Sequence, residues 1–97
     1  MAQSITLSTD PKERKQVALY RCLFQYFPDA LCAVAKHSFI SNEQHNPGTE
    51  PHWDRSKSAD ELDAMLRHVI EEEWVAVAWR ALANLQKHIE REYNEPN

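Results

Sequence analysis

Glycine is almost absent from this 97-residue chain, which contains only Gly48. Tight β-hairpin turns depend on glycine, so a sheet is hard to build from this sequence and an all-α fold is predicted. The chain also lacks an apolar run long enough to cross a bilayer and a signal-peptide layout, so we expect a cytoplasmic protein with no membrane partner. Cysteine is scarce, and Cys22 and Cys32 both fall within apolar helical pattern. With no sign of an oxidising compartment, we expect packed free thiols.

An excess of positive charge is also missing. Eleven Lys and Arg residues stand against 15 Asp and Glu, a formal net charge of −4 with His neutral. This sign disfavours capture of a nucleic-acid backbone, and it leaves carboxylates available for divalent cations. Apolar residues make up 42% of the chain, enough for the core of a single domain over residues 1–97. Because so small a domain buries a modest fraction of its surface, we expect it to need a partner.

The first half of the chain contains two predicted helices. After a frayed leader at residues 1–8, Asp10 and Pro11 indicate a helix start, because Asp can cap a helix and Pro is favoured at its first position. Apolar residues then recur at helical spacing as far as Phe27. Pro28 turns the chain and opens a second helix, which ends at the two prolines and the glycine of residues 46–51.

The second half contains two apolar stripes. Ser58 and Glu61 fit a capping box that starts a helix, and a stripe from Leu62 to Ile70 follows. After three consecutive glutamates a further stripe runs from Trp74 to Ile89, with a tail at residues 93–97. No Gly, Pro or Asn separates the stripes, so the sequence predicts either one helix of roughly thirty residues or an abrupt break at the glutamates. The single long helix would favour an intertwined dimer.

Two carboxylates at the start of the third helix are the sharpest local feature. Asp60 and Asp63 are three residues apart, so on a helix they point the same way and can share a hard cation. Two carboxylates this close repel each other, and a bound cation would remove the repulsion. Arg67, one turn after Asp63, could do the same. The alternative interpretation is a solvated first turn in which the acidic side chains interact with the helix dipole.

Polar side chains gather at the end of the second helix and in the loop after it. Asn42, Gln44 and His45 could contact the edge of a base, although polar helix ends are common. Glu43 could supply a metal ligand from this second helix. Trp53, in the loop, offers a face for stacking and is equally typical of a packing plug. The cations that could contact phosphate, each also typical of a solvated surface, are Lys57, Arg67 and Arg80.

These residues form an ordered series of motifs. The motifs are Asn42-Glu43-Gln44-His45-Asn46-Pro47-Gly48, His52-Trp53, Arg55, Lys57-Ser58-x-Asp60-x-x-Asp63, Arg67-His68 and Ala78-Trp79-Arg80-Ala81-Leu82-Ala83. The series resembles a bacteriophage family of dATP/dGTP pyrophosphohydrolases, which is similar to MazG and to MazZ of phages that use 2-aminoadenine. The resemblance covers roughly residues 14–90, and the series is far more specific than any single motif.

The resemblance implies an all-α, MazG-like helical bundle that is completed as a dimer or tetramer around magnesium ions. In MazG-like enzymes two acidic motifs on adjacent helices hold the ions. Asp60-x-x-Asp63 occupies the place of the second motif, and Glu43 is the best match for the first, with Asp29 a weaker one. The residues one turn before Glu43 are Phe39 and Ile40, so the first motif is half present.

The implied function is hydrolysis of a purine deoxynucleoside triphosphate to the monophosphate and pyrophosphate, by water activated on Mg²⁺ (or Mn²⁺). Under this hypothesis Glu43, Asp60 and Asp63 hold the ions. The remaining roles are phosphate binding by Lys57, Arg67 and Arg80, and base binding by Asn42, Gln44, His45 and Trp53. Either purine suits such a site. The alternative is a noncatalytic helical adaptor or inhibitor that acts by protein contact, which the small size and acidic charge favour.

Overall fold

The computed structural model describes residues 7–53 and 60–94. These residues form four α-helices and one π-helical turn: α1 (Pro11–Gln16), η1 (Tyr20–Phe24), α2 (Pro28–His45), α3 (Glu61–Ile70) and α4 (Trp74–Asn94). The described ranges contain no strand, so the all-α prediction is confirmed. None of their helices is long and apolar enough to cross a membrane.

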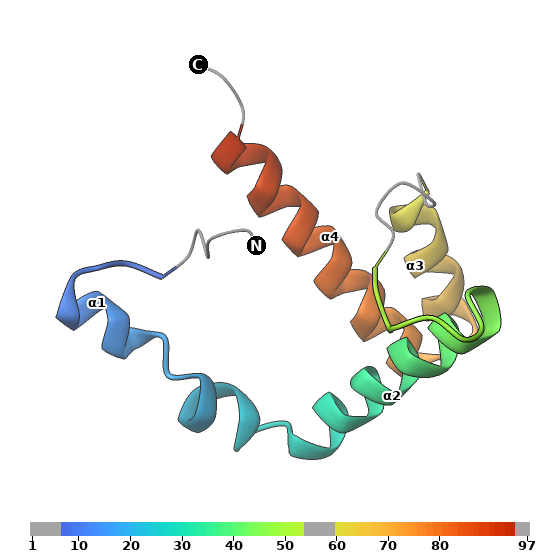
Figure 1. The fold of residues 1–97 in the computed structure, drawn as a ribbon, viewed down its shortest axis with the longest axis horizontal. Helices are drawn as coiled ribbons and strands as arrows, with labels where there is room; N and C mark the ends of the chain where they lie inside the picture. Colours follow the sequence, from blue (N-terminus) through green and yellow to red (C-terminus); the bar gives the residue numbers. More distant parts are fainter. Residues whose placement is uncertain (1–6, 54–59, 95–97) are drawn as a thin grey trace.

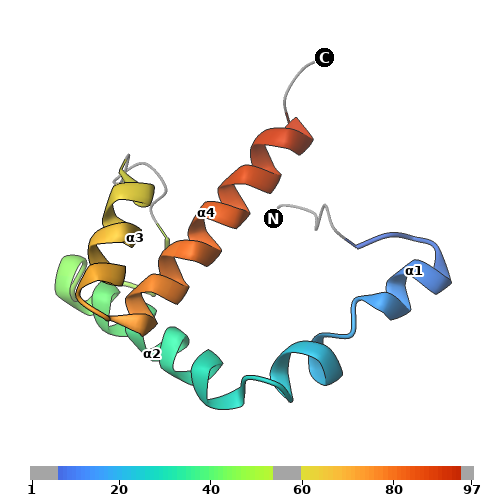
Figure 2. The same ribbon diagram turned by 180° about the vertical axis from the view of Figure 1, so that it is seen from behind.

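Three helices form a body, and the chain before them forms an arm. In the body, α4 packs against both α3 and α2. The N-terminal arm, residues 10–27, comprises α1 and η1 and extends away from the body (Figures 1 and 2). Among the described elements, α1 contacts no other helix, and η1 contacts only α2.

The arm is where the predicted continuous helix proves wrong. Its start is as expected, because Asp10 caps the helix by accepting a hydrogen bond from the Glu13 backbone N–H at 3.2 Å. The helix ends at Gln16, however, and Val17 leaves helical geometry with ψ 69°. The chain coils again at η1, where the Gln25 N–H donates to the Tyr20 carbonyl at 2.8 Å. Apart from the contact of η1 with α2, none of the described helices packs on this stretch, and its large apolar side chains stay exposed. Tertiary contacts therefore do not impose a regular helix.

Helix α2 and the loop after it match the prediction. Pro28 occupies the first turn, and the helix continues to His45. In the loop, Gly48 has φ +79°, a conformation that glycine adopts at little cost. Thr49 closes the turn by donating from its hydroxyl to the Asn46 carbonyl at 2.7 Å. The breaker residues therefore end the helix where the sequence indicated.

The break at the three glutamates is real, so the single long helix was wrong and its alternative was correct. The Glu72 N–H donates to Val69 O at 3.0 Å and the Glu73 N–H donates to His68 O at 2.9 Å, the two bonds of a Schellman cap. Glu72 sits at the left-handed position that glycine usually fills, with φ 57°. The His68 side chain also lies 2.9 Å from the Glu73 carboxylate. Since α4 folds back against α3 within one chain, the long-helix reason for a dimer no longer applies.

Three features that the sequence predicts fall wholly or partly on residues outside the described ranges. This holds for residues 1–6 of the predicted leader, for Ser58 of the predicted capping box and for residues 95–97 of the predicted tail. Helix α4 continues as far as Asn94, so it includes part of that tail.

The buried core of the described residues is very small. Its apolar members are three alanines, Ala64 on α3 and Ala76 and Ala83 on α4. Small side chains let the two helices approach closely, but they bury little apolar area. The cysteines are free, as predicted, yet both Cys22 and Cys32 are exposed rather than packed, because none of the described helices covers these two positions. Large apolar side chains therefore remain at the surface.

Candidate functional site

A cavity of about 610 Å³ lies where the end of α2, the following loop, the start of α3 and the first half of α4 meet. Asn42 and His45 line it from α2, and Trp53 lines it from the loop. Glu61 and Arg80 complete its polar wall from α3 and α4. We call this cavity the polar pocket.

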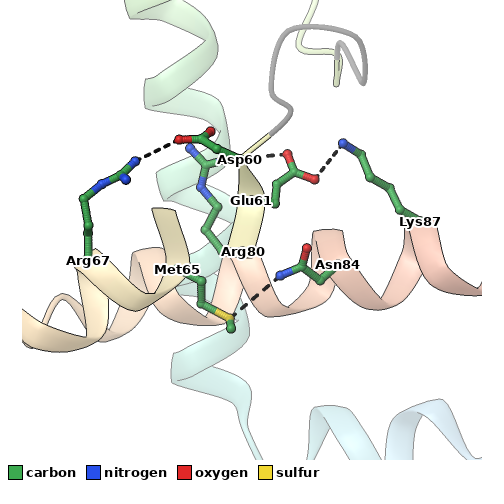
Figure 3. A network of polar contacts seen from close by, with 7 residues as sticks. All are labelled: Asp60, Glu61, Met65, Arg67, Arg80, Asn84 and Lys87. Carbon is green, nitrogen blue, oxygen red and sulfur yellow. Dashed lines mark hydrogen bonds and ion pairs between the residues drawn. The ribbon is translucent and has the colours of Figure 1, made fainter. Parts of the chain in front are cut away.

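Glu61 is the central charged group of the polar pocket. Its side chain is only 8% exposed, and its Oε2 lies 2.6 Å from Nζ of Lys87 on α4. Its Oε1 lies 3.6 Å from Nη1 of Arg80. Figure 3 shows both cations reaching from α4 toward this one carboxylate at the start of α3. The network ties the two helices together at the pocket and balances the buried negative charge.

The predicted acidic pair is not brought together at the pocket. Asp60 lines it but precedes the helix, at the N-cap position, and its Oδ2 lies 3.0 Å from Nη2 of Arg67 (Figure 3). Asp63 is exposed and is not among the lining residues. Arg67, a predicted phosphate ligand, pairs with Asp60, and both side chains of this ion pair are more than half exposed. Because Asp60 has left helical geometry, the two carboxylates do not share a helix face.

The polar end of α2 divides into two faces. Asn42 and His45 line the pocket, whereas Glu43 and Gln44 are exposed and are not among its lining residues. The reason is helical geometry: residues three apart share a face, and the two between them point elsewhere. Two of the four predicted contributors from this segment therefore lie at the cavity.

Two tryptophans form the aromatic side of the pocket. The rings of Trp53 and Trp79 meet edge to face with centroids 5.8 Å apart. Arg80 lies over the Trp79 ring at 5.5 Å, and Lys87 lies over the Trp53 ring at 5.8 Å. The cations thus connect the aromatic pair with Glu61, so the aromatic and charged sides of the pocket form one continuous surface.

Asn42 supplies a buried hydrogen-bonding group that the described part of the chain leaves unused. The side chain is 6% exposed, and its Nδ2 donates to the Thr49 carbonyl at 3.5 Å. Its Oδ1 is buried and has no hydrogen-bond partner among the residues that the structure describes. Buried amide oxygens are normally satisfied, so this acceptor is available to a ligand that carries a donor.

A divalent metal does not fit the described residues of a single chain. Residues 7–53 and 60–94 contain no group of three or more His, Cys, Asp or Glu side chains that could hold one. At the pocket, Lys87 engages Glu61 and Arg67 engages Asp60, so a cation would compete with existing ion pairs. Lys57, the remaining predicted phosphate ligand, lies outside the described residues.

The sequence reasoning missed Glu61, Lys87 and Trp79 as members of the site. Glu61 was assigned to a helix cap, and Trp79 lies within the predicted apolar stripe from Trp74 to Ile89. The sequence contained one signal for this contact. If the chain reverses at the three glutamates, Glu61 and Leu85 are equally far from Glu73, one before it and the other after it. An antiparallel pair of helices then places Glu61 opposite the stretch of α4 that carries both cations.

Comparison with protein-family models, with curated proteins and with solved structures finds no match to this chain.

Proposed function

We propose that the polar pocket binds a purine deoxynucleoside triphosphate and that the protein is a pyrophosphohydrolase of dATP or dGTP. The observation that carries the proposal is the unpartnered Oδ1 of Asn42 in a cavity that also holds two tryptophans and Arg80. Its volume of about 610 Å³ is within the range of small-molecule sites. The resemblance of the motif series to phage pyrophosphohydrolases supports the same substrate class.

Each part of the pocket suits one part of the nucleotide. An amino group on the base, which adenine and guanine both carry, can donate to Oδ1 of Asn42. Trp53 or Trp79 can stack on the base, as aromatic rings do with any nucleobase. Arg80 suits a phosphate, because its planar guanidinium matches two phosphate oxygens. Its 3.6 Å contact with Glu61 is longer than the 2.6 Å contact of Lys87, so Arg80 is the cation that can turn toward the ligand at lower cost.

The proposed reaction adds water to the α-phosphorus and releases pyrophosphate. Mg²⁺ or Mn²⁺ belongs to this proposal as the cofactor, although one chain does not assemble its site from the described residues. Self-association as a dimer or tetramer is part of the proposal as well. We place the activity in the cytoplasm, which is the host's if the chain is encoded by a phage.

The proposal is tested by incubating the protein with each dNTP and Mg²⁺ or Mn²⁺ and measuring pyrophosphate and dNMP. We expect turnover of dATP or dGTP, and weaker substrate binding in Asn42→Leu and Arg80→Met. Loss of one buried hydrogen bond, about 1–3 kcal/mol, raises Kd by about 5- to 150-fold. Lys36→Met, an exposed charge removal on the same helix as Asn42, is the matched control and should bind normally. Asp60→Asn and Asp63→Asn test the two acidic residues separately.

A noncatalytic adaptor is the second candidate. It is favoured by the ion pairs that already occupy Glu61 and Asp60, which leave these carboxylates engaged without a metal. Under this proposal no nucleotide is turned over, and neither nucleotide nor metal raises the melting temperature. Turnover that disappears in Asp63→Asn would exclude it.

A further inference from the structure

The chain exposes far more surface than a folded monomer of its mass. Proteins of 11.3 kDa typically expose about 5,700 Å², from the scaling of surface with mass. This chain exposes 8252 Å². The excess is about 2,500 Å², and a stable dimer needs only about 800 Å² from each partner. Burying about a third of this excess surface against a second copy would therefore be enough for a stable dimer.

Much of the exposed apolar surface lies on the N-terminal arm. Its rings of Tyr20 and Phe24 stack on each other, with centroids 6.2 Å apart, and remain exposed. The other large apolar side chains of the arm that are exposed are Val17, Leu19, Leu23, Tyr26 and Phe27. Because the arm contacts only α2 among the described elements, these residues join no core within the described part of the chain.

A groove that matches these apolar side chains lies on the body. Between α2 and α4 there is a mostly apolar groove of about 330 Å³, lined by Val34, Leu82, Leu85 and Ile89 among others. We call it the apolar groove. Its volume is at the low end of the range of small-molecule sites, and its mostly apolar lining suits apolar side chains rather than a triphosphate.

Charge also pairs the arm with the body. Residues 1–27 carry four basic and two acidic side chains, a net charge of +2. Residues 28–97 carry seven basic and thirteen acidic side chains, a net charge of −6. Opposite charges attract an arm to a body, whereas two bodies alone repel each other.

We propose that the arm of one copy docks its aromatic side into the apolar groove of a second copy, forming a closed twofold dimer by arm exchange. A second copy is the fitting occupant because the arm leaves its own body at Phe27 and Pro28 and stands apart from α3 and α4 in both views (Figures 1 and 2). Exchange of identical segments satisfies both grooves at once and leaves no open end.

The arm exchange would affect the polar pocket, but it does not require the pocket to bind nucleotide. The two cavities share three lining residues, Ser38, Trp53 and Trp79. A partner's aromatic ring in the apolar groove would therefore pack against the same tryptophans that line the polar pocket. The proposal concerns assembly and holds whether or not the pocket binds nucleotide. Its tests contain no nucleotide. Failure of the mixing or crosslinking test would exclude arm exchange, whereas absence of dNTP turnover would exclude the proposed function.

The first test is sedimentation equilibrium of the full chain. We expect a mass of about 22.6 kDa, twice that of one chain. Phe24→Glu on the arm and Leu85→Glu in the groove should each raise the dimer Kd by about tenfold or more, because each places a charge in an apolar contact. Both positions are exposed in the single chain, at 48% and 54%, so the substitutions do not disrupt its core. Leu62→Glu, which is 60% exposed on α3 and outside the groove, is the matched control and should remain dimeric.

Mixing the two defective variants separates arm exchange from other dimers. A mixed pair contains one intact arm facing one intact groove, so part of the dimer should return when Phe24→Glu and Leu85→Glu are combined. A monomeric wild-type protein, or no recovery on mixing while both variants keep their helicity, would overturn the proposal.

A crosslink gives a readout that does not depend on weakened variants. Cys22 lies on the arm, so it can be oxidised with the thiol introduced by Leu85→Cys in a Cys32→Ser background. Arm exchange predicts a covalent dimer on a nonreducing gel. A disulfide between the two thiols of one chain would show that the arm folds back on its own groove. A disulfide that forms only with other proteins would show a different partner. Either result would overturn the proposal.

Discussion

Replacing Glu61 with glutamine should destabilise the protein strongly, although the change removes only a charge. Glu61 is 8% exposed, and it faces Lys87, at 18% exposed, and Arg80, at 27%. Removing one partner of a buried ion pair costs about 3–5 kcal/mol, because the remaining charge is buried without compensation. The two cations keep some access to water and glutamine keeps an oxygen for Lys87, so we expect a loss of about 2 kcal/mol. In a domain of this size that loss lowers Tm by about 8–16 °C.

The loss is measured by urea unfolding followed by circular dichroism at a fixed protein concentration. Glu71→Gln, which removes an exposed charge just after the same helix, is the control and should change the free energy of unfolding by less than about 0.5 kcal/mol. Combining Glu61→Gln with Lys87→Met should cost less than the sum of the single changes, since the second change removes the stranded ammonium. If Glu61→Gln is as stable as Glu71→Gln, the carboxylate does not hold α3 against α4 and the reasoning fails.

Three further outcomes follow from individual contacts. Glu72→Gly should raise the free energy of unfolding by about 1 kcal/mol because Glu72 has φ 57°, whereas Glu71→Gly, at φ −87°, should bring no gain; urea titration checks both. Arg67→Met should cost less than about 0.5 kcal/mol in the same titration, since its ion pair with Asp60 is more than half exposed, and a larger loss would show that this pair supports the fold. Asn42→Leu should stay within about 1 kcal/mol of the wild-type stability, because it also removes an unpartnered buried oxygen, while calorimetry detects weaker binding of dATP or dGTP; unchanged binding would remove Asn42 from the site.

The predicted members of the site show why spacing along one helix is a limited guide. Asn42 and His45 reach the polar pocket, but Glu43 and Gln44, on the same turn of α2, face solvent. The sequence shows which residues share a face, but not which face the rest of the chain will cover. Glu61 was hidden for a related reason: its partners Lys87 and Arg80 belong to another helix and are near only after the chain reverses.

Local chemistry decided much of the secondary structure. Pro28 opens α2, Asp10 caps α1, and Gly48 lies in the loop that ends α2, because each residue restricts or frees its own backbone wherever the rest of the chain lies. The near absence of glycine excluded hairpins for the same reason. The all-α fold and the bounds of α2 could therefore be read from the sequence.

Tertiary structure decided the reversal at Glu72 and everything that depends on it. Three glutamates are compatible with a continuing helix, and a left-handed glutamate is locally unfavourable, so packing of α4 against α3 has to offset its cost. That packing brings Glu61 to Lys87 and Arg80 and closes the polar pocket with Trp53 and Trp79. Contacts between residues distant in sequence depend on the whole chain's free energy, which no local pattern contains.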